Sequence, residues 1–135
     1  MINTKLMSAG ARLFTGMLLM ACLLGSGCAS MTPKEQAGKS LVTVAVTVKS
    51  VMQGWAKWVT IQKANPAADQ AQLLRNEGKV SAAYEQYQAA ARIARSLYKE
   101  VATDPLASQA ELDSAIKATH EAYAKLATTV STLSK

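Results

Sequence analysis

The amino-acid sequence predicts an all-α protein, an antiparallel up-down-up three-helix bundle that follows an N-terminal signal segment. Two observations predict this fold. Apolar residues recur every three or four positions in three long segments, which is the period of an amphipathic helix. Each segment follows a proline that is preceded by a good helix-capping residue. These pairs are Thr32-Pro33, Asn65-Pro66 and Asp104-Pro105. Long helices joined by short turns pack antiparallel.

The first segment, residues 1–27, has the composition of a secretory signal. Lys5 and Arg12 are its only charged residues, and the apolar run Leu13–Leu24 follows them. As a helix this run would span roughly 18 Å, well short of a bilayer core of about 30 Å. A short basic region, a short apolar core and small residues after it predict an export signal rather than a membrane-spanning helix.

The stretch Leu23-Leu24-Gly25-Ser26-Gly27-Cys28-Ala29-Ser30 resembles the lipobox of bacterial lipoproteins. In that family the cysteine is acylated and becomes the first residue of the mature chain. The resemblance therefore implies a covalent lipid on Cys28, and we expect no other cofactor. Gly25 departs from the leucine that the family prefers three residues before the cysteine. A second candidate, Leu19-Met20-Ala21-Cys22, has that leucine but a shorter apolar core.

The same resemblance implies a location. Ala29, rather than Asp, follows the cysteine, as in lipoproteins sorted to the outer membrane, so we expect attachment at its periplasmic face. The inner membrane and the cell surface stay open. Residues 28–32 would form a short lipid-anchored linker and residues 33–135 the helical bundle domain. The four residues 29–32 reach about 14 Å when extended, which would hold the bundle close to the membrane.

The first predicted helix starts at Pro33, where Thr32-Pro33-Lys34-Glu35 has the pattern of a capping box. Residues Val42–Val48 also alternate as in a strand, but no other segment offers a partner strand, so we expect a helix. Gly54 should weaken this helix by about 1 kcal/mol relative to alanine. Its apolar seam is Leu41, Val44, Val48, Val51, Trp55, Trp58 and Gln62.

The second helix is expected after Asn65-Pro66, and the third after Asp104-Pro105 or, because Ser108-Gln109-Ala110-Glu111 is another capping box, at Ser108. Gly78 leaves open whether the second helix is continuous or broken. The second seam is Val80, Tyr84, Tyr87, Ala91, Ala94, Tyr98 and Val101. The third seam is Leu112, Ile116, Thr119, Tyr123, Leu126, Val130 and Leu133.

The composition excludes most catalytic and metal chemistry. The chain has one histidine and two cysteines, too few for a multi-ligand zinc site or a disulfide framework. The histidine, His120, has no serine or cysteine partner suggested by the sequence, so a nucleophilic triad has no support. We therefore expect a non-enzymatic protein without a metal site. After residue 27 the side chains carry a net charge of +4, which favours anionic headgroups or cell-wall polymers as partners, and nucleic acid is a poor candidate for an exported protein.

Two groups of residues are candidate contacts. Trp55 and Trp58 are either partner-facing aromatics or core anchors. Arg92, Arg95 and Lys99 follow one another at helical spacing and are either contacts for an anion or a solvated face. The core is expected to be thin, because alanine is about as frequent after residue 27 as leucine, isoleucine and valine together. A homo-oligomer that covers part of the bundle stays open.

The leading hypothesis is a lipid-anchored helical envelope protein that binds or scaffolds components near the membrane surface. Its partners would be the membrane, through the lipid, and an envelope protein or a cell-wall polymer. The alternative is a prophage-encoded lipoprotein for superinfection exclusion or lysis, because the stretch 82–91 resembles small alanine-rich helical proteins of prophage regions. The end Ser134-Lys135 resembles that of peptidoglycan-linked lipoproteins, which leaves covalent attachment to the cell wall as a further alternative.

Overall fold

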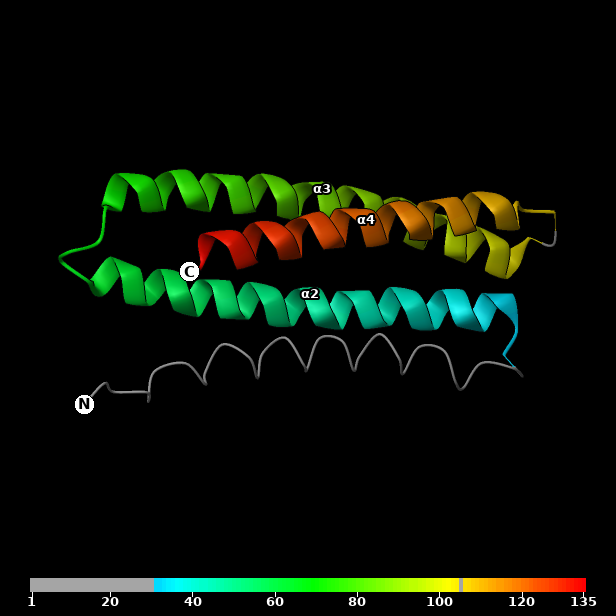
Figure 1. Ribbon diagram of the computed structural model, residues 1–135. Coiled ribbons are helices and arrows are strands. Elements are labelled where there is room, and N and C mark those ends of the chain that lie inside the picture. The colour runs from blue at the N-terminus through cyan, green and yellow to red at the C-terminus, as the bar shows by residue number, and fades with distance from the viewer. Residues whose placement is uncertain (1–30, 105) are drawn as a thin grey trace, which may run out of the picture. The chain divides into compact units, whose positions relative to one another are not determined.

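The computed structural model describes residues 31–104 and 106–135, and these form three helices (Figure 1). They are α2 (Pro33–Ala64), α3 (Gln70–Thr103) and α4 (Gln109–Leu133). Successive helices run in opposite directions, and each packs against both of the others. The predicted all-α three-helix bundle is therefore confirmed. The predicted signal segment and both cysteines, Cys22 and Cys28, lie outside the described residues.

A membrane-spanning helix needs about 20 consecutive, mainly apolar residues. None of the three is long and apolar enough to cross a bilayer. The compact helical unit comprises Pro33–Lys135.

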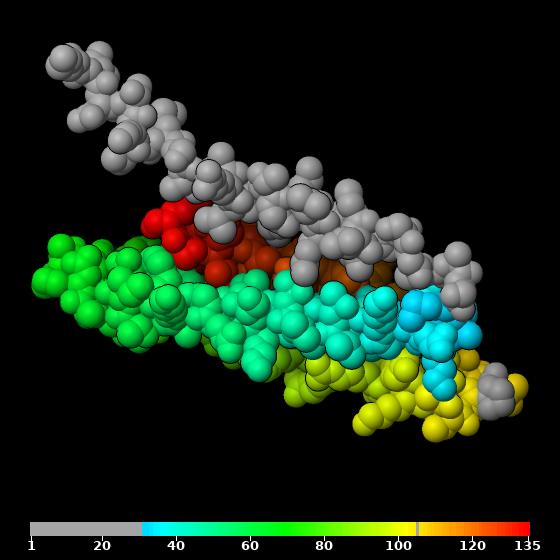
Figure 2. Space-filling view, turned by 90° about the horizontal axis from the view of Figure 1, so that it is seen from below, coloured from blue at the N-terminus to red at the C-terminus, as the bar shows by residue number. Residues whose placement is uncertain are grey.

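The alternating valines of α2 are helical and divide between two faces. Val44 and Val48 are 5% and 3% exposed and belong to the core, whereas Val42 and Val46 are each 63% exposed. The outer face of α2 runs along the surface of the helical unit (Figure 2). A spacing of four residues puts Val44 and Val48 on one stripe of the helix. Because this stripe packs against α3 and α4, the segment is a helix and not a strand.

The core seam of α2 differs from the predicted one near its end. Val59 is buried, while Trp58 and Gln62 are only half-buried. Trp55 remains in the core, where its ring stacks on Trp58 with centroids 4.9 Å apart. The predicted seam drifts off the core here because a straight helix does not keep a strict heptad repeat over many turns.

The expected cap at Asn65 was wrong. The Asn65 Oδ1 accepts a hydrogen bond from the Ala67 amide at 3.0 Å, which closes a local turn. The helix α3 starts five residues later, with Asp69 as its N-cap, and the Asp69 Oδ1 accepts from the Gln72 amide at 2.9 Å. Asparagine side chains serve turns and caps equally well, which is why the sequence alone misplaces this boundary.

The expected cap at Asp104 was also wrong, and the alternative start at Ser108 is confirmed. Asp104 is the C-cap of α3, and its Oδ1 accepts a hydrogen bond from the Leu106 amide at 2.8 Å. The Ser108 hydroxyl accepts from the Glu111 amide at 3.3 Å and caps α4. The helices α3 and α4 thus each begin at a side-chain N-cap, Asp69 and Ser108 respectively.

Gly78 does not break α3, which is one helix from Gln70 to Thr103. Asn76 before it and Val80 after it are both buried against the bundle. Tertiary packing on either side therefore compensates for the low helix propensity of the exposed glycine.

The core consists of a large cluster and a smaller one. The large cluster includes Trp55, Val80, Tyr87 and Leu126, and the smaller one joins Leu41, Ala94 and Ala115. The buried Thr119 hydroxyl donates to the Ala115 carbonyl at 2.8 Å, so it is satisfied within α4. The many alanines allow the helices to approach closely, but they fill little volume.

Candidate functional site

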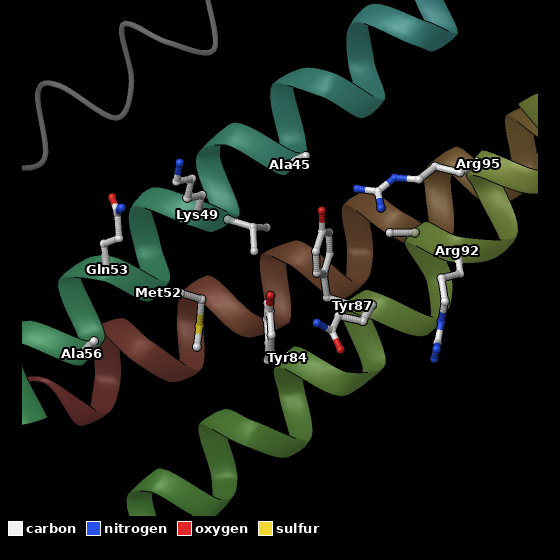
Figure 3. A pocket seen from close by; sticks show the side chains of 12 residues that line it. Ala45, Lys49, Met52, Gln53, Ala56, Tyr84, Tyr87, Arg92 and Arg95 are labelled. Atoms are coloured by element: carbon white, nitrogen blue, oxygen red, sulfur yellow. The ribbon is translucent and has the colours of Figure 1, made fainter.

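A groove of about 700 Å³ lies between α2 and α3 (Figure 3). From α2 it is lined by Ala45, Val48, Lys49, Met52, Gln53 and Ala56. From α3 it is lined by Tyr84, Tyr87, Gln88, Ala91, Arg92 and Arg95. This volume lies within the range of sites for small ligands. We call this feature the α2–α3 groove.

The groove lies between two places where α2 and α3 are held together. At one end the Lys63 ammonium and the Glu77 carboxylate form a salt bridge of 2.9 Å. At the other end Gly38 lies so near Tyr98 that an added Cβ would be 2.8 Å from the phenol oxygen. Between these contacts the small side chains of Ala45, Ala56 and Ala91 leave space unfilled.

The basic side chains of the groove have no acidic neighbour in its lining. Lys49, Arg92 and Arg95 line it, and no aspartate or glutamate does. Within residues 31–104 and 106–135, none of these three cations forms a salt bridge. Their potential is therefore not cancelled locally, and an anion in the groove would meet an unopposed positive field.

Tyr84 and Tyr87 project from α3 into the space below α2 (Figure 3). Their rings stack with centroids 6.3 Å apart. Burial raises the pKa of Tyr87 above its usual value, although the Arg95 cation lowers this pKa and Tyr84 raises it further. The Tyr87 phenol is therefore protonated at neutral pH and can donate a hydrogen bond to an acceptor.

The side chains of Arg92 and Arg95 point in different directions. Arg95 extends its guanidinium toward the hydroxyl of Tyr87, whereas Arg92 extends away from it (Figure 3). Of the predicted anion contacts, Arg92 and Arg95 thus line the groove, and Lys99 does not. Lys49 was missed as a contact, although its position between Val48 and Val51 in an apolar seam is a signal that the sequence contains.

The candidate aromatic contacts are placed in different environments. Trp55 is 6% exposed and belongs to the core. Trp58 is half-buried and lines a second hollow of about 190 Å³ together with Leu73, Leu133 and Lys135. Of the two indoles, Trp58 is therefore the one with surface available to a partner.

His120 has a serine partner that the sequence did not suggest. The Ser40 Oγ of α2 lies 2.7 Å from the His120 Nε2 of α4, across 80 positions of sequence. A nucleophilic serine also needs its histidine to be oriented by a third group. In the described ranges, no carboxylate forms a hydrogen bond with His120, and no three His, Cys, Asp or Glu residues cluster as metal ligands. The pair is a contact between helices.

Comparisons with known proteins provide no assignment: no family model, no curated protein and no solved structure matches this chain significantly.

Proposed function

We propose that this chain is a lipid-anchored, non-enzymatic protein of the bacterial envelope, which binds an anionic envelope component in the α2–α3 groove. The observation that carries the proposal is the groove lining, in which Lys49, Arg92 and Arg95 lie without any acidic side chain. Cations that face a concave surface of this size attract and orient an anion more strongly than cations on a convex surface.

The predicted anchor supports the same proposal. A lipid on Cys28 would fix the chain to a membrane, and the helical unit begins at Pro33. The residues between them, 29–32, reach about 14 Å. The anchor would therefore hold the start of α2 near the headgroups, where anionic partners are concentrated. The groove begins at Ala45, about 18 Å along α2 from Pro33.

A photoreactive amino acid placed in the groove tests the proposal in cells. Gln53 lines the groove and is exposed, so position 53 suits the probe. Position 61 is the matched control, because Ile61 is an exposed residue of the same helix that does not line the groove. After irradiation, adducts would be identified by the mass of the purified protein.

The expected result is an adduct with an envelope component from position 53, none from position 61, and loss of the first when Cys28→Ala removes the anchor. Equal adducts from both positions would show that the groove is not the binding surface. An adduct from position 53 that survives Cys28→Ala unchanged would show that the anchor does not place the groove.

A further inference from the structure

We propose that the ligand of the α2–α3 groove is a phosphorylated amphiphile, with its phosphate at the Arg95 end of the groove and its apolar chain at the Ala56 end. This inference rests on the proposed function for its location near the membrane. It goes further because it assigns the chemical class of the ligand and its direction in the groove.

The first argument is the polarity of the groove along its length. Because α2 and α3 run in opposite directions, Arg95 lies by Ala45, while Tyr84 lies by Met52 and Ala56 (Figure 3). The Arg95 guanidinium therefore lies at one end of the groove, and a thioether, an aromatic ring and a methyl group line the other. A small hydrophilic anion would use only the first end, whereas an amphiphile matches both.

The second argument concerns the headgroup. The Arg95 guanidinium extends into the groove toward Tyr87, whereas Arg92 and Lys49, which also line the groove, extend their charged ends away from this point (Figure 3). Arginine presents a planar fork of donors that fits phosphate oxygens, and such charge-assisted hydrogen bonds are the strong ones. The protonated Tyr87 hydroxyl, which Arg95 approaches, adds a neutral donor. A phosphate offers more acceptor oxygens than a carboxylate and so uses this donor set more completely.

The third argument concerns the chain of the ligand. Val48 and Ala91 are buried at the base of the groove, and Met52 packs against the main core cluster. An apolar chain laid over these side chains would remove apolar surface from water, at roughly 25 cal/mol for each Å². The flexible Met52 side chain adapts to chains of different shape.

Calorimetric titration of the full-length protein with dihexanoyl phosphatidic acid, below its micelle concentration, tests the inference. Inorganic phosphate and dihexanoyl phosphatidylcholine are the comparison probes, since the first lacks the chain and the second has a neutral headgroup. We expect the phosphatidic acid to bind at least tenfold more tightly than either. If inorganic phosphate binds as tightly as phosphatidic acid, the groove is a site for a free anion and the proposed amphiphilic ligand is wrong.

Two arginine variants locate the site. Arg95→Gln removes a guanidinium from the groove, and we expect it to weaken phosphatidic acid binding by about 10-fold to 100-fold. Arg75→Gln is the matched control, because Arg75 lies on the same helix outside the groove and bonds only Gln72 of its own helix. The affinity of Arg75→Gln for phosphatidic acid should stay within about twofold of the wild-type value. Equal losses of affinity in both variants would show that binding depends only on the net charge of the protein, and would contradict the proposed site.

A variant at the apolar end tests the assigned direction. Ala56→Leu should weaken phosphatidic acid binding while leaving inorganic phosphate binding unchanged, because the larger side chain fills the space assigned to the chain. An unchanged phosphatidic acid affinity would overturn the direction. If no probe binds while position 53 still forms its anchored adduct, the ligand class is wrong and the proposed function stands. If that adduct is absent as well, both proposals fail.

Discussion

Two glycines of α2 differ in what surrounds them, and the difference predicts opposite effects of the same substitution. A Cβ added at Gly54 would meet nothing within 4 Å. A Cβ added at Gly38 would lie 2.8 Å from the phenol oxygen of Tyr98 and 3.1 Å from its Cζ. The rigid ring of Tyr98 packs against the smaller core cluster, so it has limited freedom to move away.

The magnitudes follow from helix propensity and packing. Alanine is favoured over glycine inside a helix by about 1 kcal/mol, so Gly54→Ala should stabilise the protein by that amount. For a domain of roughly 100 residues this corresponds to a rise in melting temperature of about 4 °C or more. Gly38→Ala gains the same helix propensity but also overpacks the contact with Tyr98, which costs about 1–3 kcal/mol. We therefore expect Gly38→Ala to be neutral or to destabilise by up to about 2 kcal/mol.

Urea unfolding followed by circular dichroism measures both free energies. A Tyr98→Phe background serves as the control for the clash, because it removes the phenol oxygen that lies closest to the added carbon. In that background Gly38→Ala should be less unfavourable, with a coupling energy of about 0.5 kcal/mol or more. If Gly38→Ala stabilises the wild-type chain as much as Gly54→Ala does, the close approach of α2 and α3 at Tyr98 is refuted.

Two further predictions concern a helix cap and an ionisable side chain. Ser108→Ala removes the N-cap of α4 and should lower the free energy of unfolding by about 1 kcal/mol in urea titrations. Ser108→Asp should retain most of the wild-type stability, because aspartate is also a good N-cap. An unchanged stability in the alanine variant would show that the cap contributes nothing. Burial raises the pKa of Tyr87 in the folded chain, so the folded state holds its proton more tightly than the unfolded state does. Stability should therefore be unaffected by this group below pH about 10 and should fall as pH rises above that value. Unfolding curves at rising pH should show a smaller fall for Tyr87→Phe than for wild type, and identical falls would contradict the assignment.

The helices were predictable because their signals are local. Val44 and Val48 share a face because of their spacing alone. Ser108, followed three residues later by Glu111, has the capping-box pattern that predicts the start of α4. The caps expected at Asn65 and Asp104 failed because these side chains bond to nearby amides in turns just as readily as at helix starts. No sequence pattern separates the two uses.

The sequence could predict the basic residues that α3 contributes to the groove, but not their pairing with α2. Arg92 and Arg95 follow one another by helical spacing within α3, so the sequence indicates that they share a face. Lys49 joins them only because α2 and α3 pack in one register, which contacts such as that of Gly38 with Tyr98 help to set. The pairing of Ser40 with His120 depends in the same way on the register of α2 and α4. Contacts between distant segments depend on side-chain packing, which periodicity does not specify.

The intact mass of the protein recovered from membrane fractions tests the central claim most directly. The account predicts a chain that begins at Cys28 and carries added acyl mass, that loses this mass in Cys28→Ala and that keeps it in Cys22→Ala. An unacylated chain, or acyl mass that depends on Cys22, would contradict it, because the start of α2 would then no longer be held within a few residues of the membrane.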